Sequence, residues 1–256
     1  VMKISIVTIA FNAEATIADA VKSVVGQVGD NFELEYIIVD GASSDGTLAA
    51  IEPFQDRIAT IISEPDRGLY DGMNKGVNAA TGDFIGILNA DDTYDHEKVL
   101  QRVAKTLSTT SADSLYGDLV YVDEGDRVVR HWKSGGLQNG KFNPRGFLNG
   151  WMPPHPTFFL RKSAYDRHGS FNLRLKSAAD YELMLRMLFK HRISTAYIPE
   201  VLVRMRTGGV SNASLKNRWR ANREDRMAWR LNNLTPFPWT LVAKPLRKLS
   251  QWRRTP

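Results

Sequence analysis

Residues 82–95 read GDFIGILNADDTYD and join a short apolar run to an acidic turn. The run from Phe84 to Leu88 is too short for a helix and predicts a buried strand. Asn89, Asp91 and Asp92 follow it, so we expect them at the carboxyl end of that strand. Ligands bind at this edge in open parallel α/β sheets, where adjacent carboxylates repel unless a cation or donors neutralise them. Both a site for Mg²⁺ or Mn²⁺ and an acidic turn that caps the next helix fit this pattern.

The residues before this stretch alternate between strand and helix patterns. β-branched and apolar runs predict strands at 3–10, 36–39 and 58–63, and apolar spacings of three and four predict helices at 17–28 and 69–80. This alternation predicts a parallel sheet. Polar loops at 8–12, 40–45 and 64–71 follow the three strands, so they are expected to converge with Asp91 on one edge of the sheet.

The second half of the chain departs from this pattern. A helix is expected from about Asp95 to Leu107, and the runs at 115–123 and 127–132 predict an antiparallel hairpin. The glycine-rich segment at 133–150 fits a plain connector or a mobile lid. Ser177 or Asp180 is placed to cap a strongly apolar helix at 183–189, and a further strand is expected at 196–206.

Composition excludes several classes of protein. The 256 residues contain 43% hydrophobic residues, enough for one large α/β domain with or without an appendage. Cysteine is absent, which excludes disulfides, thiolate metal sites and cysteine nucleophiles and fits a reducing compartment. No apolar stretch approaches the roughly 18 residues of a membrane span, and the start of the chain predicts a strand rather than a signal peptide.

Charge divides the chain unevenly. Residues 204–256 hold 13 Lys and Arg against two acids, whereas residues 1–203 hold 21 basic and 26 acidic residues. The basic tail is interleaved with Trp219, Trp229, Trp239 and Trp252 and is broken by prolines. Such a segment can lie on an anionic membrane surface or pack as a terminal helix with solvated arginines, and we favour the membrane. The prolines and tryptophans suit lipid better than nucleic acid.

Four motifs in this order resemble a known family: SIVTIAFN at 5–12, VDGASSDGT at 39–47, EPDRGLYDGMNKG at 64–76 and LNADD at 88–92. Together they resemble a family 2 inverting glycosyltransferase with a GT-A fold, of the bacterial type that extends surface polysaccharides or glycolipids. The resemblance covers residues 3 to about 211. It implies an α/β fold, a three-layer α/β/α arrangement around a mostly parallel sheet. The expected domain is 1–212, with a nucleotide-sugar half at 1–110 and an acceptor half at 111–212, followed by an extension at 213–256.

The resemblance also implies roles for individual residues. It implies that three residues surround the base of the nucleotide sugar: Thr8, Phe11 and Asp40. The residues that bind the rest of the donor are Asp66, Asp71, Asn74, Lys75, Asn89 and Asp91. Asp91 takes the last position of the family's Asp-x-Asp motif, whose first position is Asn89 here. Metal contacts are expected from Asp91, its neighbour Asp92 and His155, which a proline-rich turn brings toward the acidic edge. Asp180, preceded by Ala179 in place of the family's Glu, is the expected catalytic base.

These residues suit sugar transfer, in which a leaving diphosphate must be neutralised and an acceptor hydroxyl deprotonated. We therefore expect a glycosyltransferase that uses Mn²⁺ or Mg²⁺ to move a sugar from a UDP-linked donor to a lipid-linked, glycolipid or polysaccharide acceptor. It is expected in the cytoplasm, peripheral at the inner membrane face through its extension, without a nucleic-acid partner. The alternatives are a sugar-phosphate nucleotidyltransferase and a nucleotide- or anionic-surface-binding module without catalysis.

Overall fold

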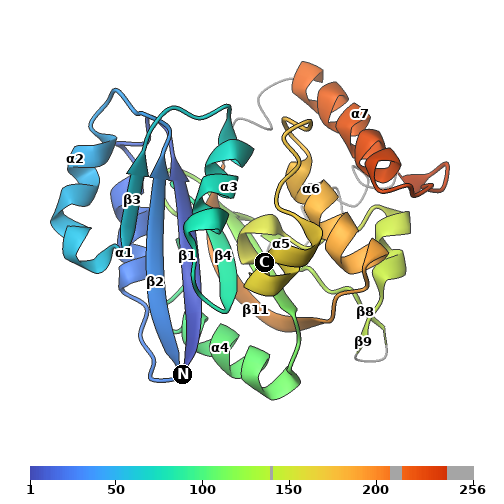
Figure 1. Ribbon diagram of the computed structural model, residues 1–256, viewed down its shortest axis with the longest axis horizontal. Coiled ribbons are helices and arrows are strands. Elements are labelled where there is room, and N and C mark those ends of the chain that lie inside the picture. The colour runs from blue at the N-terminus through green and yellow to red at the C-terminus, as the bar shows by residue number, and fades with distance from the viewer. Residues whose placement is uncertain (139–140, 208–214, 241–256) are drawn as a thin grey trace.

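A computed structural model describes residues 1–138, 141–207 and 215–240, and within them nine strands form one sheet (Figure 1). Its order is β3-β2-β1-β4-β10-β6-β11-β5, and β7 pairs with β6. The strands are β1 (Met2–Ala10), β2 (Phe32–Asp40), β3 (Thr60–Ser63), β4 (Phe84–Asn89), β5 (Asp92–Tyr94), β6 (Ser114–Val122), β7 (Val128–Trp132), β10 (Phe159–Arg161) and β11 (Thr195–Arg206). The short strands β8 (Leu137–Gln138) and β9 (Lys141–Phe142) pair separately.

Helices cover both faces of this sheet. They are α1 (Ile17–Val25), α2 (Thr47–Ile51), α3 (Leu69–Ala79), α4 (Val99–Thr110), α5 (Lys162–His168), α6 (Ala179–Met184) and α7 (Leu215–Leu231). Shorter turns are the 3₁₀ segments η1 (Glu52–Arg57), η2 (Pro144–Asn149) and η3 (His155–Thr157), and the π-helical η4 (Leu185–Lys190) that continues α6.

The hydrophobic core has two layers, one on each face of the sheet. The side chains of β1 contribute to both layers, because successive side chains of a strand point to opposite faces. Ile4 and Ile6 pack into the cluster that contains the buried residues of α1 and α4. Val7 and Ile9 pack into the other cluster, with α3, α6 and α7. The expected three-layer α/β/α arrangement with a mostly parallel sheet is confirmed.

Strand directions agree with the sequence in the first half of the chain. β1 runs parallel to β2 and β4, and β2 runs parallel to β3. The predicted hairpin is present as the antiparallel pair β6 and β7. Antiparallel β10 lies between β4 and β6, so β4 and β6 point the same way and their carboxyl ends share an edge.

Some boundaries differ from those expected. Asp92 begins the short strand β5, which pairs with β11 at Met205, whereas the sequence suggested a turn leading directly into a helix. The next helix therefore starts at Val99 rather than near Asp95. The first helix ends at Val25 before Gly26, and Val28 beyond it is 45% exposed.

Helix α7, near the end of the described residues, packs on the rest of the protein. α7 lies beside α6 (Figure 1), and its Ala228 and Trp229 are fully buried in the core layer that holds α6. Trp229 Nε1 donates to the Tyr181 hydroxyl at 2.9 Å, and Asn232 Nδ2 donates to Glu182 at 2.9 Å. Packing of a terminal helix, one of the two interpretations of the basic tail, therefore holds for this part. None of the helices in the described residues is long and apolar enough to span a bilayer.

Candidate functional site

Strand register places all four motifs at one edge of the sheet. Ala10, at the end of β1, is level with Asp40 of β2, and Asp40 is level with Ser63 of β3. On the other side of β1, Ile9 is level with Asn89 of β4. Because these strands are parallel, the loops at 11–12, 41–46, 64–68 and 90–91 all leave from the same edge.

Phe11, Gly41 and Asp66 form a small cradle at this edge. A Cβ atom added to Gly41 would lie 2.7 Å from Asp66 Oδ2 and 3.4 Å from Phe11 Cδ2, so the three residues enclose a space that a side chain would fill. Phe11 is 65% exposed at the end of β1. An exposed aromatic ring beside a carboxylate suits stacking and hydrogen bonding to a nucleobase, the role predicted for Phe11.

Thr8 and Asp40, the other residues predicted around the base, are both fully buried. Thr8 Oγ1 accepts a hydrogen bond from the Tyr36 hydroxyl at 3.0 Å. Asp40 accepts from the backbone amide and hydroxyl of Ser43 and from the hydroxyl of Ser63 at 2.7 Å. Both side chains are thus bonded inside the sheet, and Asp40 fixes the loop that begins at Gly41.

The predicted donor residues of α3 are held by neighbouring segments. Asp71 accepts from the amide and guanidinium of Arg67, and Arg67 lowers the pKa of Asp71. Lys75 Nζ donates to Pro65 O at 2.8 Å and pairs with Glu64 at 2.9 Å. These contacts tie the 64–67 loop to α3, next to the cradle.

Asn74 connects α3 to the second half of the chain. Its Nδ2 donates to Phe171 O at 2.9 Å, and its Oδ1 accepts from Phe171 N at 2.8 Å. Both ends of the amide are therefore engaged across 97 residues of sequence. Asn74 therefore joins the two halves of the chain, and its contact with the donor stays a prediction.

The acidic turn contains one buried carboxylate, Asp92, and one accessible carboxylate, Asp91. Asp92 is fully buried and its Oδ2 accepts from Asn89 Nδ2 at 3.0 Å, whereas Asp91 is half-buried. Asn89 Oδ1 and Asp92 Oδ1 are both buried without a hydrogen-bond partner. Burial raises the pKa of Asp91 and raises the pKa of Asp92 well above its usual range; for Asp92 the charge of Asp91 adds to this effect.

Unsatisfied buried oxygens are costly, and a divalent cation would satisfy them. Carboxylate and amide oxygens are the hard ligands that Mg²⁺ prefers, and one or two carboxylates are enough when substrate phosphates complete the coordination. Asn89, Asp91 and Asp92 fit such a cation. No group of three His, Asp or Glu side chains placed to hold a metal occurs in residues 1–138, 141–207 and 215–240, so His155 does not complete a set with the two aspartates.

His155 lies beside Asp180 instead. Burial lowers the pKa of His155, and the negative charge of Asp180 acts in the opposite direction. The imidazole packs edge-on against Phe171, with ring centroids 5.7 Å apart. Asp180 is half-buried at the start of α6, and its Oδ1 accepts a hydrogen bond from the Tyr70 hydroxyl at 3.0 Å. Tyr70 belongs to α3, so the expected base lies next to the helix that carries Asp71, Asn74 and Lys75.

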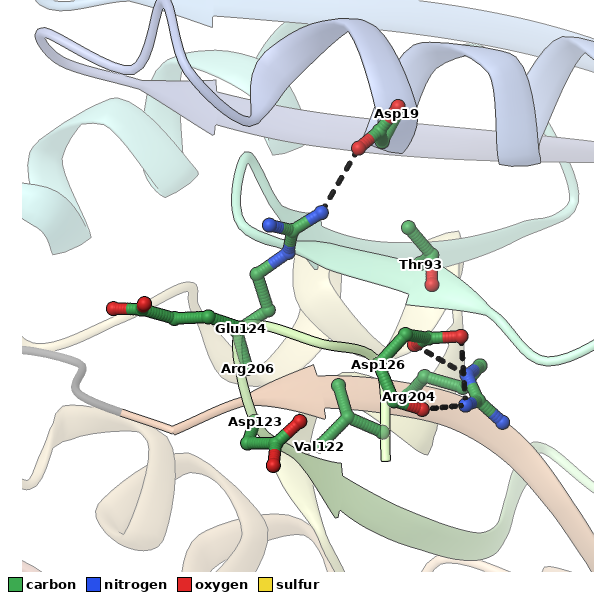
Figure 2. A pocket seen from close by; sticks show the side chains of 8 residues that line it. All are labelled: Asp19, Thr93, Val122, Asp123, Glu124, Asp126, Arg204 and Arg206. Atoms are coloured by element: carbon green, nitrogen blue, oxygen red, sulfur yellow. Dashed lines mark hydrogen bonds and ion pairs between the residues drawn. The ribbon is translucent and has the colours of Figure 1, made fainter. Parts of the chain in front are cut away.

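A second cluster borders the acidic turn on the side of β5 (Figure 2). These residues line a hollow of about 260 Å³ and are Asp19, Thr93, Val122, Asp123, Glu124, Asp126, Arg204 and Arg206. Arg206 pairs with Asp19 at 2.9 Å, and Arg204 pairs with Asp95 and Asp126. Burial keeps the pKa of both Asp91 and Asp92 raised, and the positive charge of Arg206 opposes this shift only in part.

Sequence reasoning missed Tyr70 and Arg206 as neighbours of the site. Tyr70 stands inside the third quoted motif, two residues after Gly68, but only the fold shows that it reaches a residue 110 positions away. Arg206 belongs to the basic segment 204–256 in the sequence, whereas strand β11 brings it beside Asp91 and Asp92. Local spacing carries no signal for either contact.

Comparisons with known proteins agree with this arrangement. Residues 5–179 match the family model described as Glycosyl transferase family 2. A "PGL/p-HBAD biosynthesis glycosyltransferase" of Mycobacterium bovis is 28% identical over 260 residues, which cover 98% of this chain and 97% of that protein. An "uncharacterized glycosyltransferase" of Mycobacterium tuberculosis is 32% identical over 189 residues, 72% of this chain and 68% of that protein.

Two solved structures share the fold. Residues 1–349 of S. aureus TarS, in complex with UDP-GlcNAc, align with a TM-score of 0.72 and 19% identity over 90% of this chain, which spans 65% of that TarS chain. The mannosyltransferase PcManGT of Pyrobaculum calidifontis, in complex with GDP-Man and Mn²⁺, aligns with a TM-score of 0.60 and 17% identity over 99% of this chain and 76% of its own. At these identities the likeness concerns the fold alone.

The family match covers more than half of the chain and carries the motifs that meet at the sheet edge. It therefore favours the expected transferase over the nucleotidyltransferase and over a binding module without catalysis. The chain belongs to glycosyl transferase family 2, has a GT-A fold and is a glycosyltransferase.

Proposed function

We propose that this glycosyltransferase moves a sugar, with inversion, from a UDP-linked donor to a hydroxyl of a lipid-linked saccharide, glycolipid or polysaccharide, and that it requires Mn²⁺ or Mg²⁺. One observation carries the proposal. α3 starts beside the Phe11–Gly41–Asp66 cradle, and its Tyr70 contacts Asp180 at 3.0 Å. A donor in the cradle and a base at Asp180 would then both adjoin the first turns of α3.

In this proposal the side chains divide the reaction between them. Phe11 and Asp66 hold the nucleotide, and Asn89 and Asp91, supported by buried Asp92, hold the cation. When bound, the cation neutralises charge on the leaving diphosphate. Asp180 accepts the proton of the acceptor hydroxyl as that hydroxyl attacks the anomeric carbon from the side opposite the leaving group. The attack inverts the anomeric configuration and needs no protein nucleophile.

Donor identity is tested by thermal unfolding with nucleoside diphosphates. UDP with Mn²⁺, at 100 times its Kd, is expected to stabilise the native state by about 2.7 kcal/mol. That corresponds to a rise in Tm of about 5–10 °C for a chain of this size. GDP with Mn²⁺, UDP with EDTA and Mn²⁺ alone are the matched controls. A larger shift with GDP would overturn the choice of uridine, and equal shifts with and without Mn²⁺ would overturn the metal requirement.

The acceptor class has separate support. The Mycobacterium bovis relative, which aligns over almost all of both chains, is named for PGL/p-HBAD biosynthesis, a glycolipid pathway.

The C-terminal extension offers a surface that could contact the membrane in which such an acceptor lies. Arg223, Arg226 and Arg230 are exposed on α7. Phe237 and Trp239 follow it, 44% and 53% exposed, with ring centroids 4.7 Å apart. Basic residues beside exposed aromatic rings favour an anionic membrane surface, here the inner face of the cell membrane.

Exchange of both exposed rings, Phe237→Ser with Trp239→Ser, is expected to reduce binding to vesicles rich in phosphatidylglycerol by about tenfold, because the interfacial contact of both rings is lost. Vesicle flotation measures this change. Leu48→Ser is the control, since Leu48 is similarly exposed, at 40%, on α2. Removal of residues 213–256 is a poor test because it also removes buried Trp229. Unchanged flotation of the double variant would exclude the two rings as the membrane contact.

A further inference from the structure

The hydrogen bond between Tyr70 and Asp180 joins two elements that are distant in sequence. Tyr70 is 8% exposed on α3, and its hydroxyl donates to Asp180 Oδ1 at 3.0 Å. Burial raises the pKa of Tyr70, and the charge of Asp180 adds to this effect. The phenol therefore stays protonated at neutral pH and can donate to Asp180.

Neighbouring contacts hold the Tyr70 ring in place. It stacks on Phe171 with ring centroids 5.7 Å apart and planes inclined by 20°. Phe171 is itself held by the two hydrogen bonds of its backbone to Asn74, one turn further along α3. His155 closes the other side of Phe171 edge-on. The hydroxyl can thus leave Asp180 only if a packed set of rings is rearranged.

The contact occupies one oxygen of the Asp180 carboxylate and leaves the other available. No hydrogen bond from a described residue reaches Asp180 Oδ2, and the residue is half-buried rather than closed off. A general base works only when its basic oxygen is held within hydrogen-bond reach of the proton it removes. A carboxylate pinned at one oxygen has fewer orientations than one that rotates freely, and orientation of this kind contributes directly to rate.

We propose that Tyr70 is a positioning residue, whose hydroxyl fixes the carboxylate of Asp180 so that Oδ2 faces the acceptor hydroxyl. The inference rests on the proposed role of Asp180 as the base. It adds a link between the two halves of the enzyme, because Tyr70 precedes Asp71 on the helix that is tied to the donor cradle. The donor-side helix thereby sets the orientation of the acceptor-side base.

Tyr70→Phe tests the inference, because it keeps the ring stacked on Phe171 and removes only the hydroxyl. We expect kcat to fall about tenfold, while KM for the donor stays within about twofold of the wild-type value. Tyr181→Phe is the matched control. It removes another buried phenol, whose hydroxyl accepts a hydrogen bond from Trp229, and it is expected to lose stability without a comparable loss of kcat.

A double-mutant cycle with Asp180→Asn separates this inference from the proposed function. If Tyr70 acts through Asp180, Tyr70→Phe lowers kcat in the wild-type background and has no further effect on the residual rate of Asp180→Asn. Equal losses in both backgrounds, or a wild-type kcat for Tyr70→Phe beside an inactive Asp180→Asn, would overturn the positioning role alone. Full activity of Asp180→Asn would instead overturn the base on which the inference rests.

Discussion

Asp180→Asn is expected to lower kcat about 10³-fold, with KM for the nucleotide sugar within about threefold of the wild-type value. The amide keeps the size of the carboxylate and can still accept the Tyr70 hydrogen bond, but it cannot take a proton from the acceptor. General base catalysis contributes about 10²–10⁴-fold to rates, so the loss should appear in the chemical step. Steady-state release of UDP with a saturating acceptor measures it.

Asp166→Asn is the control for this variant. Asp166 is a surface carboxylate of the same half of the chain, paired with Lys162 at 2.7 Å on α5, and its loss should leave turnover unchanged. Thermal unfolding of Asp180→Asn checks that the fold is intact. An Asp180→Asn enzyme that turns over at the wild-type rate would show that another group removes the proton, and the division of labour proposed for the two halves would fail.

Asp91→Asn is expected to lower kcat/KM for the donor about 10²–10³-fold and to raise the Mn²⁺ concentration that gives half-maximal rate. Asp91 is the accessible carboxylate of the acidic turn, whereas Asp92 is fully buried and holds Asn89. Without the Asp91 charge, the cation is held by neutral amides and one buried group, and stabilisation of the leaving diphosphate by several kcal/mol weakens. Rates measured across a Mn²⁺ series report both changes.

The same variant gives a binding readout that does not depend on turnover. The rise in Tm produced by UDP with Mn²⁺ should shrink toward that seen with UDP and EDTA. Asp113→Asn serves as the control, because Asp113 pairs with Arg161 at 2.8 Å near the amino end of β6, away from the site. If Asp91→Asn kept the full Mn²⁺-dependent shift in Tm, the cation would be bound elsewhere.

The first half of the fold could be predicted because its strands carry their own signal. The later parts of β1 and β2 and nearly all of β4 are buried on both faces and rich in apolar residues, and each strand ends in a polar loop. That pattern fixes the parallel sheet, and a parallel sheet fixes which loops meet. The convergence of the motifs followed from local sequence and one topological rule.

The details of the site could not be predicted in the same way, because they depend on contacts between distant segments. β5 is only three residues long and exists because β11 supplies its partner, so Asp92 becomes a buried strand residue rather than part of a turn. Asp40 and Thr8 were expected around the base, and the structure shows that both are fully buried and bonded to the hydroxyls of Ser43, Ser63 and Tyr36. Residue type identified these positions without showing which way the side chains face.

In the basic extension, the sequence did not show which aromatic residues are buried and which are exposed. Its arginines and tryptophans suggested one surface role for the whole segment, yet the structure assigns different roles to different residues. Trp229 is fully buried against Tyr181, while Trp239 is 53% exposed. An aromatic residue in a basic segment can belong to the core or to an interface, and the surrounding helix packing decides which.

Glu224 of α7 accepts hydrogen bonds from the backbone amides of Lys176 and Ser177, at 3.0 and 2.7 Å, just before Asp180. A helix that follows the family match thus holds the segment that leads to the expected base, although the match itself stops at residue 179. This matters for recombination between relatives. A chimera intended to change acceptor preference should exchange residues 171–190 together with α7 as one block. A crossover between these two segments would combine the helix that carries Asp180 with an α7 from another protein, and the contacts of Glu224 would be lost.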